Sequence, residues 1–464
     1  MQLYNSLTNQ IEPVEDSSVS LYSCGPTVYD NVHIGNLFAF IVADTVRRSL
    51  EISGKKIKHV MNTTDVDDKT IKRSLTEHPE MKPKEALKLT TRKFEEIFID
   101  DSKKVGIDIS RIQIVRATEH IKQMQAMILD LFKAKIAYVA DDGIYFSIES
   151  YKDNYKYGVL SKITNESTGM ARVANDEYDK DNIHDFALWK RSEPNEPAWD
   201  FEIEGENIAG RPGWHIECSA MSTAHLPQPM TIHTGGVDLK FPHHENEIAQ
   251  STGSNGKQFA KFFIHSEHVL VDSKKMSKSL GNFYTLRNVE DKGFESLAFR
   301  LLVLQSHYRH QLNFSWHSLE AAQNFLHKLR RAADRQFQPT DSSDLNLEIF
   351  KDAKKDILNS LQNDLETPQA LSSLAKLINI IENNSLDSKS IKELIELLGF
   401  VDQAFGLDLS NRQDIDMNQK RLIEQRNNAR DNNDYESSDR ARDELKANGI
   451  NLKDTDFGTI WFRE

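Results

Sequence analysis

Cysteine is scarce in this sequence, with only Cys24 and Cys218 in 464 residues. Two cysteines that lie so far apart in sequence cannot build the disulfide framework of a small secreted domain. We therefore expect a reducing, cytoplasmic compartment. Long hydrophobic runs are also lacking, since no stretch approaches the ~20 apolar residues that span a bilayer. The first residues carry neither a basic start nor an apolar segment, so we expect no secretory signal and no membrane association.

An excess of positive charge is lacking as well. Lysine and arginine number 58 against 71 aspartate and glutamate residues, which gives a net charge of −13. The chain as a whole therefore does not attract nucleic acid, and any RNA contact must use local basic faces and depend on salt. The content of 38% hydrophobic and 28% charged residues is ordinary for a globular protein.

The chain is long enough for about three domains and shows no fixed-period repeat. Residues 19–25 read as a short strand, 37–51 carry apolar residues at helical spacing, and 57–64 read as a second strand. Strand, helix and strand in this order predict a βαβ unit and hence a parallel sheet.

The remaining pattern is mixed up to about residue 290 and helical after it. We expect helices over 82–135, a hairpin with an Asp-Gly turn over 138–148, an insertion with exposed loops over 150–183, and strands over 184–190, 228–233 and 263–271. Turn-rich composition near 339–343 and 409–416 predicts boundaries within the helical part.

A turn that can receive phosphate follows the first strand. Gly25 and Gly35 allow close backbone approach, and His33 and Asn36 can donate hydrogen bonds at the start of a helix, where the dipole favours an anion. Taken alone this segment is a weak signal, because a helix-start turn with a surface histidine has the same composition.

A lysine-rich loop lies much later, at Lys274-Lys275-Met276-Ser277-Lys278-Ser279. Crowded like charges repel unless an anion joins them, although a solvated basic loop is an equally good reading of the composition. The two segments in this order, with a βαβ unit between them, predict a nucleotide site.

The two segments resemble the signature motifs of class I aminoacyl-tRNA synthetases. The resemblance implies that ATP binds at His33, Gly35, Asn36, Lys275 and Lys278, with Mg²⁺ accompanying it. Lys278 is expected to contact the phosphates in the transition state, with Lys275 assisting, so that catalysis consists of positioning and charge neutralisation. His33 and Asn36 complete the expected catalytic set.

Four residues have the chemistry of a zinc site: Cys24, Cys218, His243 and Glu247. His243 and Glu247 share a face if they lie on one helix, since they are four positions apart. Each cysteine alone is more often a packing residue, and the pair His243–Glu247 alone is more often a surface pair. Their nearness to functional segments favours a metal site.

The segments Gly-Trp-His-Ile-Glu-Cys-Ser (213–219) and Phe-Pro-His-His-Glu-Asn-Glu (241–247) resemble those of the cysteinyl-tRNA synthetase family. The resemblance implies one zinc ion per chain, held by the four residues above, which binds the substrate thiol and rejects a serine hydroxyl without an editing site. It also implies that Trp214 packs against the cysteine substrate, and that Thr64, Asp238 and His233 hold its ammonium and carboxylate groups. Plain core packing remains an alternative for Trp214, and a strand-end hydroxyl for Thr64.

Three positions depart from the family pattern. Asn36 stands where many class I enzymes have a second histidine, and Phe38 stands where members commonly carry arginine. Thr234 replaces the first glycine after His233, which puts close nucleotide approach there in doubt.

The resemblance extends to the C-terminal half and completes the expected architecture. It implies an α/β fold: a Rossmann-like parallel-sheet catalytic domain over 1–290 with an insertion over about 112–185, an all-α bundle that contacts the tRNA stem over 291–400, and a small anticodon-binding domain over 401–464. The expected tRNA contacts are Arg426, Arg430, Arg440, Arg442 and Trp461. A salt-bridged, solvated helix face is the alternative for these arginines.

The function expected from the sequence is therefore that of a cysteinyl-tRNA synthetase, which joins L-cysteine to tRNA(Cys) with ATP as a monomer. Two alternatives remain. One is a related ligase that joins cysteine to an amino sugar and needs no anticodon end. The other is a tRNA-binding paralogue without catalytic activity.

Overall fold

The computed structural model describes residues 1–162, 168–173, 183–277 and 280–463. The chain forms two compact units. The first comprises Met1–Asn288 and Tyr308–Asn313, and the second comprises Val289–His307 and Phe314–Glu464. Within the described residues, none of the helices has the length and apolar character that crossing a membrane requires. The division into three domains stays a prediction.

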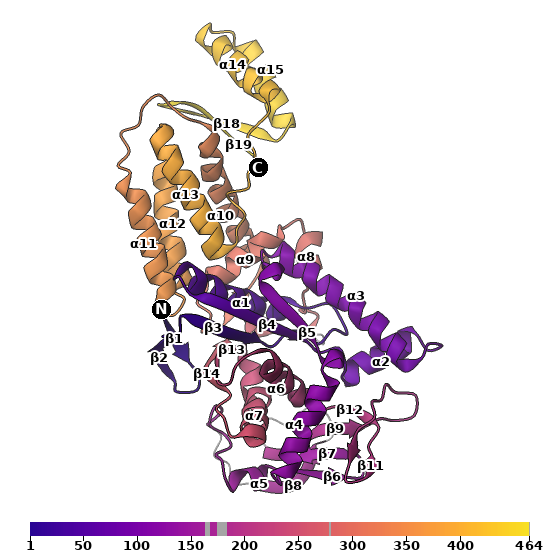
Figure 1. The fold of residues 1–464 in the computed structure, drawn as a ribbon. Helices are drawn as coiled ribbons and strands as arrows, with labels where there is room; N and C mark the ends of the chain where they lie inside the picture. Colours follow the sequence, from indigo (N-terminus) through magenta and orange to yellow (C-terminus); the bar gives the residue numbers. More distant parts are fainter. Residues whose placement is uncertain (163–167, 174–182, 278–279, 464) are drawn as a thin grey trace. The chain divides into compact units, whose positions relative to one another are not determined.

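A five-stranded parallel sheet forms the centre of the first unit (Figure 1). The predicted strand–helix–strand unit is confirmed, and the last two strands follow much later in the chain. In spatial order the strands are β14 (Ala260–Ser266), β13 (Met230–Gly236), β3 (Ser18–Ser23), β4 (Lys56–Thr63) and β5 (Ile112–Arg116). Strand β5 lies within 82–135, a range for which the sequence predicts mostly helix, and its five residues are too few for periodicity to reveal.

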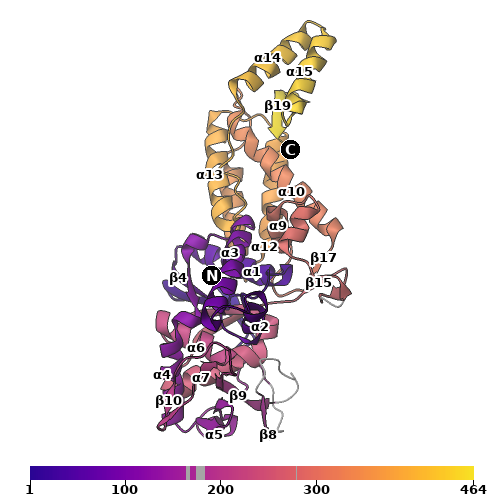
Figure 2. The same cartoon turned by 90° about the vertical axis from the view of Figure 1, so that its right-hand side faces the viewer.

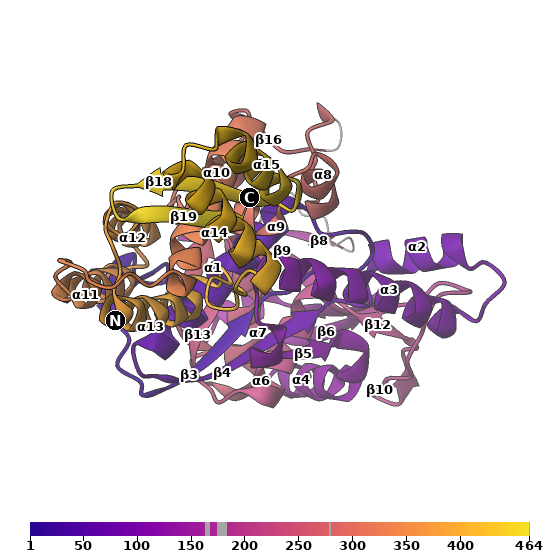
Figure 3. The ribbon, with the colours of Figure 1, turned by 90° about the horizontal axis from the view of Figure 1, so that it is seen from above.

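Helices cover both faces of this sheet. Helix α1 (Ile34–Ile52) packs on one face, and α6 (Trp214–His225) and α7 (Glu245–Asn255) lie on the other (Figure 1). Helices α2 (Asp68–Glu77) and α3 (Pro83–Lys104) pack side by side, as the view from above shows (Figure 3). The doubly covered parallel sheet confirms the α/β, Rossmann-like class.

A second sheet, in the order β12-β9-β7-β6 with β8 paired to β9, begins within the expected insertion of about 112–185 and extends beyond it to β12. The predicted hairpin with its Asp-Gly turn is confirmed as β6 and β7. Strand β8 lies within 150–183, where exposed loops are expected, and residues 163–167 and 174–182 of that stretch lie outside the described residues. The strands of this sheet are β6 (Ala137–Ala140), β7 (Gly143–Phe146), β8 (Thr168–Val173), β9 (Ile183–Arg191) and β12 (Gly210–Pro212). Helix α4 (Ile121–Lys133) precedes β6, and α5 (Ile148–Lys152) lies between β7 and β8. Two small antiparallel pairs also belong to this unit: β1 (Gln2–Asn5) with β2 (Gln10–Pro13), and β10 (Glu202–Ile203) with β11 (Glu206–Asn207).

The strand expected over 263–271 is divided in two. Its first part belongs to β14, whereas β15 (Val269–Val271) joins a separate small sheet with β16 (Lys274–Lys275) and β17 (Leu312–Phe314). The lysine loop therefore starts from this small sheet rather than from the parallel one. Helix α8 (Leu286–Asp291) follows the loop.

The second unit is mainly helical, as the sequence predicts (Figure 2). It ends in an antiparallel hairpin, and Ile415, Leu445, Ile450 and Trp461 form a small buried core there. The elements are α9 (Ser296–Leu304), α10 (Trp316–Asp334), α11 (Glu348–Gln362), α12 (Thr367–Glu382), α13 (Ser388–Phe405), α14 (Met417–Asp431), α15 (Tyr435–Ala447), β18 (Ile450–Thr455) and β19 (Gly458–Arg463).

Candidate active site

The site is built at the carboxyl ends of adjacent parallel strands. Cys24 directly follows β3, Thr64 directly follows β4, and β13 ends at Gly235 and Gly236. In open α/β sheets this edge is where ligands bind, because the loops that follow the strands diverge there. Helices α6 and α7 bring further side chains to the same edge from one face of the sheet.

A buried metal-binding constellation lies at this edge. The donor atoms of Cys24, Cys218, His243 and Glu247 all lie within 4.8 Å of one another. The two Sγ atoms are 3.9 Å apart, and His243 Nε2 is 2.7 Å from Glu247 Oε1. Two thiols, one imidazole and one carboxylate match the donors that zinc prefers in a tetrahedron, so these side chains fit a zinc ion.

The positions of Cys218, His243 and Glu247 on or beside α6 and α7 explain how these ligand candidates come together. Cys218 lies on α6, and Glu247 lies in the first turn of α7. His243 lies one helical turn before Glu247, in the turn Lys240–His244 that leads directly into α7. Their spacing of four residues therefore puts the imidazole and the carboxylate on one face.

Two further histidines lie beside the cluster: His233, which is predicted from the sequence to hold the substrate, and His244, for which no role is predicted. His233 Nε2 is 2.5 Å from Glu247 Oε2, and His244 Nε2 is 3.4 Å from Cys24 Sγ. Cys24, His233, His244 and Glu247 thus form a second set of donors within 4.8 Å of one another. His244 Nδ1 is tied to His265 Nε2 at 2.9 Å.

Charges at the cluster are strongly coupled. Burial would raise the pKa of the Cys218 thiol, but the hydrogen bond from Cys24 and the neighbouring His243 lower it to about 6. Burial would also raise the pKa of Glu247, yet His233 and His243 hold it well below its usual range. Burial raises the pKa of the Cys24 thiol well above its usual range. Burial would lower the pKa of His243, but Glu247 and Cys218 raise it to about 10. Metal binding therefore has to displace protons from Cys24 and His243, whereas Cys218 and Glu247 already favour their charged forms.

The residues expected to hold the cysteine substrate surround the cluster. The half-buried Trp214 stacks on His243 with ring centroids 4.2 Å apart. His233 is buried beside Glu247, as described above. Asp238 is exposed in the short turn Val237–Leu239, and a Cβ at Gly236 would lie 2.5 Å from its Oδ1.

Thr64 has a partner that sequence reasoning missed. Its hydroxyl donates a 2.7 Å hydrogen bond to Oε2 of Glu217, which is completely buried on α6. Burial raises the pKa of Glu217 well above its usual range, and the Thr64 hydrogen bond opposes this. The signal in the sequence was an acidic residue directly before Cys218 on a helix that is otherwise buried at this point.

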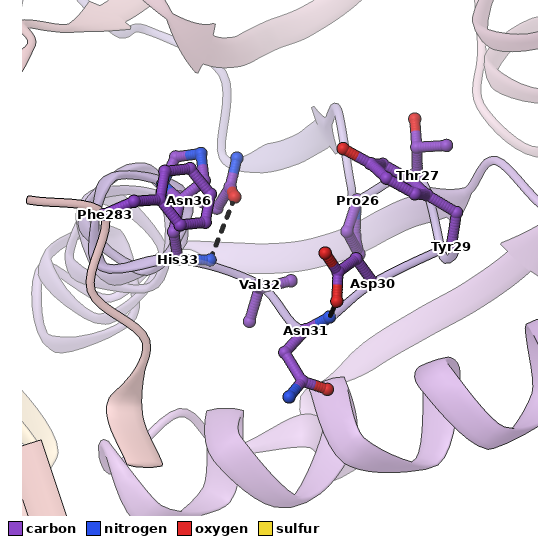
Figure 4. A pocket seen from close by; sticks show the side chains of 9 residues that line it. All are labelled: Pro26, Thr27, Tyr29, Asp30, Asn31, Val32, His33, Asn36 and Phe283. Carbon is purple, nitrogen blue, oxygen red and sulfur yellow. Dashed lines mark hydrogen bonds between the residues drawn. The ribbon is translucent and has the colours of Figure 1, made fainter. Parts of the chain in front are cut away.

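A polar pocket of about 170 Å³ lies at the start of α1 (Figure 4). His33 is the N-cap of this helix: its Nδ1 accepts from the Asn36 N–H at 3.2 Å, and Asn36 Oδ1 accepts from the His33 N–H at 3.3 Å. An imidazole whose Nδ1 accepts carries its hydrogen on Nε2, and the amide of Asn36 retains donors of its own. Other residues that line the pocket are Pro26, Thr27, Tyr29, Asp30, Asn31, Val32 and Phe283.

The lysine loop lies against this turn. A Cβ at Gly35 would be 3.0 Å from Cε of Met276, and the Phe283 ring meets the His33 ring edge-on at 4.7 Å. The Ile34 N–H also donates to the Tyr284 carbonyl at 2.9 Å. The structure thus brings the two signature segments together. Lys275 is exposed on β16, and Lys278 lies outside the described residues.

The start of α7 is anchored through Glu245, another residue that the sequence did not single out. Its buried carboxylate accepts hydrogen bonds of 2.8–2.9 Å from the backbone N–H groups of Gly158, Val159, Leu160 and Ser161. Four donors on one carboxylate fix the insertion to the helix that carries Glu247.

The structure explains each of the three positions that depart from the family pattern. Phe38 is 1% exposed on α1, so it belongs to the core. Thr234 is buried as well, and its Oγ1 lies 2.8 Å from Ser23 Oγ in the sheet. Asn36 completes the cap described above.

The residues expected to contact tRNA separate into two groups. Arg426 and Trp461 are 3% and 5% exposed, so the RNA contacts predicted for them conflict with their burial. The Arg426 guanidinium pairs with Asp454 through both of its Nη atoms, and Trp461 belongs to the small core. Both side chains stabilise this part of the second unit. The group at the surface is Arg430, Arg440 and Arg442.

Comparison with known proteins agrees with this geometry. Residues 10–324 match the family model described as tRNA synthetases class I (C) catalytic domain. The cysteine–tRNA ligase of Brachyspira hyodysenteriae is 39% identical over 484 aligned positions, which cover 99% of each chain. The chain belongs to the cysteine–tRNA ligase family. A cysteine–tRNA ligase of Leptospira interrogans is also 39% identical, with 99% of each chain covered.

Solved structures confirm the fold of this family member at low sequence identity. The methionyl-tRNA synthetase of Mycobacterium tuberculosis, in complex with methionyl-adenylate, has a TM-score of 0.59 at 11% identity and covers 84% of this chain and 91% of its own. LeuRS of Agrobacterium radiobacter, solved as a ternary complex, has a TM-score of 0.60 at 10% identity and covers 85% of each chain. These similarities concern the class I fold alone.

Proposed function

We propose that this chain activates L-cysteine with ATP to cysteinyl-adenylate and pyrophosphate, and then transfers cysteine to the 3′ end of tRNA(Cys). The observation that carries the proposal is the placement of a thiol-rich metal constellation next to a phosphate-binding turn. Both meet at the carboxyl edge of one sheet, and the segment from Cys24 to Asn36 contributes to each.

In this proposal Cys24, Cys218, His243 and Glu247 hold one zinc ion. When bound, zinc would lower the pKa of the substrate thiol and bind the thiolate far better than a serine hydroxyl. Trp214 forms a wall of the amino-acid site. Thr64, Asp238 and His233 together hold the ammonium and carboxylate groups of cysteine, with the negatively charged Asp238 suited to the ammonium group.

The phosphate side uses donors and positive charge. His33 Nε2 and the Asn36 amide donate hydrogen bonds to ATP from the start of α1, where the helix dipole also favours an anion. Gly35 keeps the turn narrow enough for Met276 to lie against it. Lys275 and Lys278 neutralise charge that develops on the α-phosphate, and Mg²⁺ accompanies ATP.

Contact with tRNA is proposed for the exposed arginines of the second unit. Arg430, Arg440 and Arg442 can pair with backbone phosphates. Replacing Arg440 and Arg442 by alanine should weaken tRNA binding several-fold and reduce its salt dependence. Cysteine-dependent ATP–pyrophosphate exchange should be unchanged.

The decisive experiment measures zinc content together with ATP–pyrophosphate exchange. Wild type should hold one zinc per chain and exchange only with cysteine, while Cys218→Ser should lose both. The neighbouring variants His243→Asn and His244→Asn form a matched pair, because only the first is a ligand in the proposed set. Exchange driven equally by serine, or zinc lost only with His244→Asn, would contradict the proposal.

The second step needs its own test. Purified tRNA(Cys) should accept cysteine, whereas an amino-sugar acceptor should not. Joining of cysteine to the sugar would favour the related ligase. Binding of tRNA without any exchange would favour a paralogue that lacks catalytic activity.

A further inference from the structure

Only one of the two carboxyl oxygens of Glu217 has a hydrogen-bond partner within the described part of the chain. Its Oε2 accepts the hydroxyl hydrogen of Thr64 at 2.7 Å, and its Oε1 is buried without a hydrogen-bond partner there. Glu217 itself is 0% exposed. A buried, half-satisfied carboxyl group is costly, so it is expected to be retained for a ligand or a positioning role.

The hydroxyl of Thr64 is held in one orientation. A threonine hydroxyl has one hydrogen to donate and two lone pairs that accept. The hydrogen is committed to Glu217, and one lone pair faces the Asn62 amide at 3.4 Å. The second lone pair can therefore accept from a further donor, and Glu217 prevents the hydroxyl from turning its hydrogen toward that donor.

The position of this pair points to the amino end of the substrate. Asn62 also accepts from the Gly25 N–H at 2.9 Å, directly after Cys24, and Glu217 directly precedes Cys218. The hydrogen-bond network around Thr64 thus includes Gly25 and Glu217, the sequence neighbours of the two cysteines.

The local charge favours a cationic donor. Glu217 interacts electrostatically with Asp65, Asp67 and Cys218. All of these groups are neutral or negative, so the potential at Thr64 attracts a cation and repels a carboxylate. An α-ammonium group meets both requirements, since it carries positive charge and donates three hydrogen bonds.

We propose that Glu217 is a positioning residue for the substrate: it orients the Thr64 hydroxyl so that its oxygen accepts from the α-ammonium group of cysteine. This inference rests on the proposed function and deepens it, because it assigns selection for an amino acid over a plain thiol to a residue outside the metal ligands. Zinc holds the sulfur end, and the Glu217–Thr64 pair recognises the nitrogen end.

The test compares two thiols on the zinc-loaded enzyme by calorimetry. L-Cysteine carries the ammonium group, and 3-mercaptopropionate has the same thiol and carboxylate without it. Wild type should prefer L-cysteine by roughly tenfold or more, the scale of one charge-assisted hydrogen bond. The Glu217→Met variant removes the acceptor for the Thr64 hydroxyl and should reduce this preference about tenfold, leaving 3-mercaptopropionate affinity and zinc content unchanged.

Thr64→Val and the double variant check that Glu217 acts through Thr64. Thr64→Val should lose the same preference, and Glu217→Met should add nothing to it, because the two residues form one unit. Thr64→Ser keeps the hydroxyl and should retain the preference. If Glu217→Met does not fold, the Thr64→Ser and Thr64→Val pair still carries the test.

Several results would overturn the assignment. Glu217→Met could weaken both thiols equally or lower the zinc content, which would show a merely structural role. Unchanged preference in Glu217→Met, or additive losses in the double variant, would also overturn it. The proposed function is judged separately, by cysteine-dependent exchange in the wild type.

Discussion

The indole of Trp214 lies on the imidazole of His243, with ring centroids 4.2 Å apart and planes inclined by 26°. Trp214 is the first residue of α6, and His243 precedes α7, so the stack joins the two helices that carry Cys218 and Glu247. One ring thus serves both as a wall for the amino acid and as a support for a proposed metal ligand.

We therefore expect Trp214→Ala to raise the KM for cysteine in ATP–pyrophosphate exchange by about tenfold, because an aromatic stack and its buried area are lost together. Trp214→Phe should retain most of the affinity. The KM for ATP should not change. Trp199→Ala is the control, since that indole packs beside Lys84 instead. An equal loss in the control would contradict the prediction.

Stability should fall as the pH is lowered, partly because of His59. Burial, helped by the nearby Arg47, lowers the pKa of this histidine to about 3. The unfolded chain binds a proton near pH 6.5 and the folded one does not, so this contribution is complete above about pH 6.5 and is lost below it. The loss reaches about 2 kcal/mol by about pH 5.

The measurement is the pH dependence of unfolding in urea. His59→Gln cannot titrate and can keep a hydrogen bond to Ser23, whose Oγ lies 2.8 Å from His59 Nε2. The variant should therefore show a shallower decline between neutral and acidic pH. A decline as steep as that of wild type would exclude His59 as a source.

Asp454 should stabilise the end of the second unit through Arg426. Asp454→Asn removes the charge opposite a guanidinium that is 4% exposed, at an expected cost of about 1–3 kcal/mol. Tryptophan fluorescence during denaturation would report this change, since Trp461 lies in the adjacent core. The exposed Asp456 provides the control variant Asp456→Asn, which should be neutral. Cysteine-dependent exchange should survive both changes.

Two glycines should respond in opposite ways to alanine. A Cβ at Gly25 would lie 1.7 Å from the Asn62 carbonyl oxygen, so Gly25→Ala should cost at least about 3 kcal/mol and lower the zinc content. A Cβ at Gly399, within α13, meets nothing within 4 Å. Gly399→Ala should stabilise by about 0.5–1 kcal/mol, as measured by urea denaturation. A stable Gly25→Ala variant would contradict this reading.

The sequence correctly predicted the structural features that depend on a short, continuous stretch of residues. The βαβ unit, the hairpin near Gly143 and the turn at His33 each depend on a short stretch of chain whose pattern is readable by itself. The approach of Cys24 to Cys218 was predictable because both stand beside distinctive segments. The position of β5 was not, since five residues at a sheet edge leave too short a pattern.

Features that depend on long-range pairing escaped prediction for a physical reason. The role proposed for Glu217 depends on Thr64, far away in sequence, and composition cannot show that its second oxygen lacks a partner among the described residues. Arg426 and Trp461 have the residue types of an RNA-binding surface. Their burial depends on Asp454 and on the small core of the C-terminal hairpin, which no local pattern reveals.

The anchor formed by Glu245 has a consequence for redesign of the insertion. Its carboxylate is 1% exposed and takes all four backbone donors of Gly158–Ser161. A deletion that removes this stretch would leave a bare negative charge two positions before Glu247. Reporter tags, shortened variants or grafted loops in the insertion must therefore keep those four residues, or amino-acid recognition will suffer at a distance.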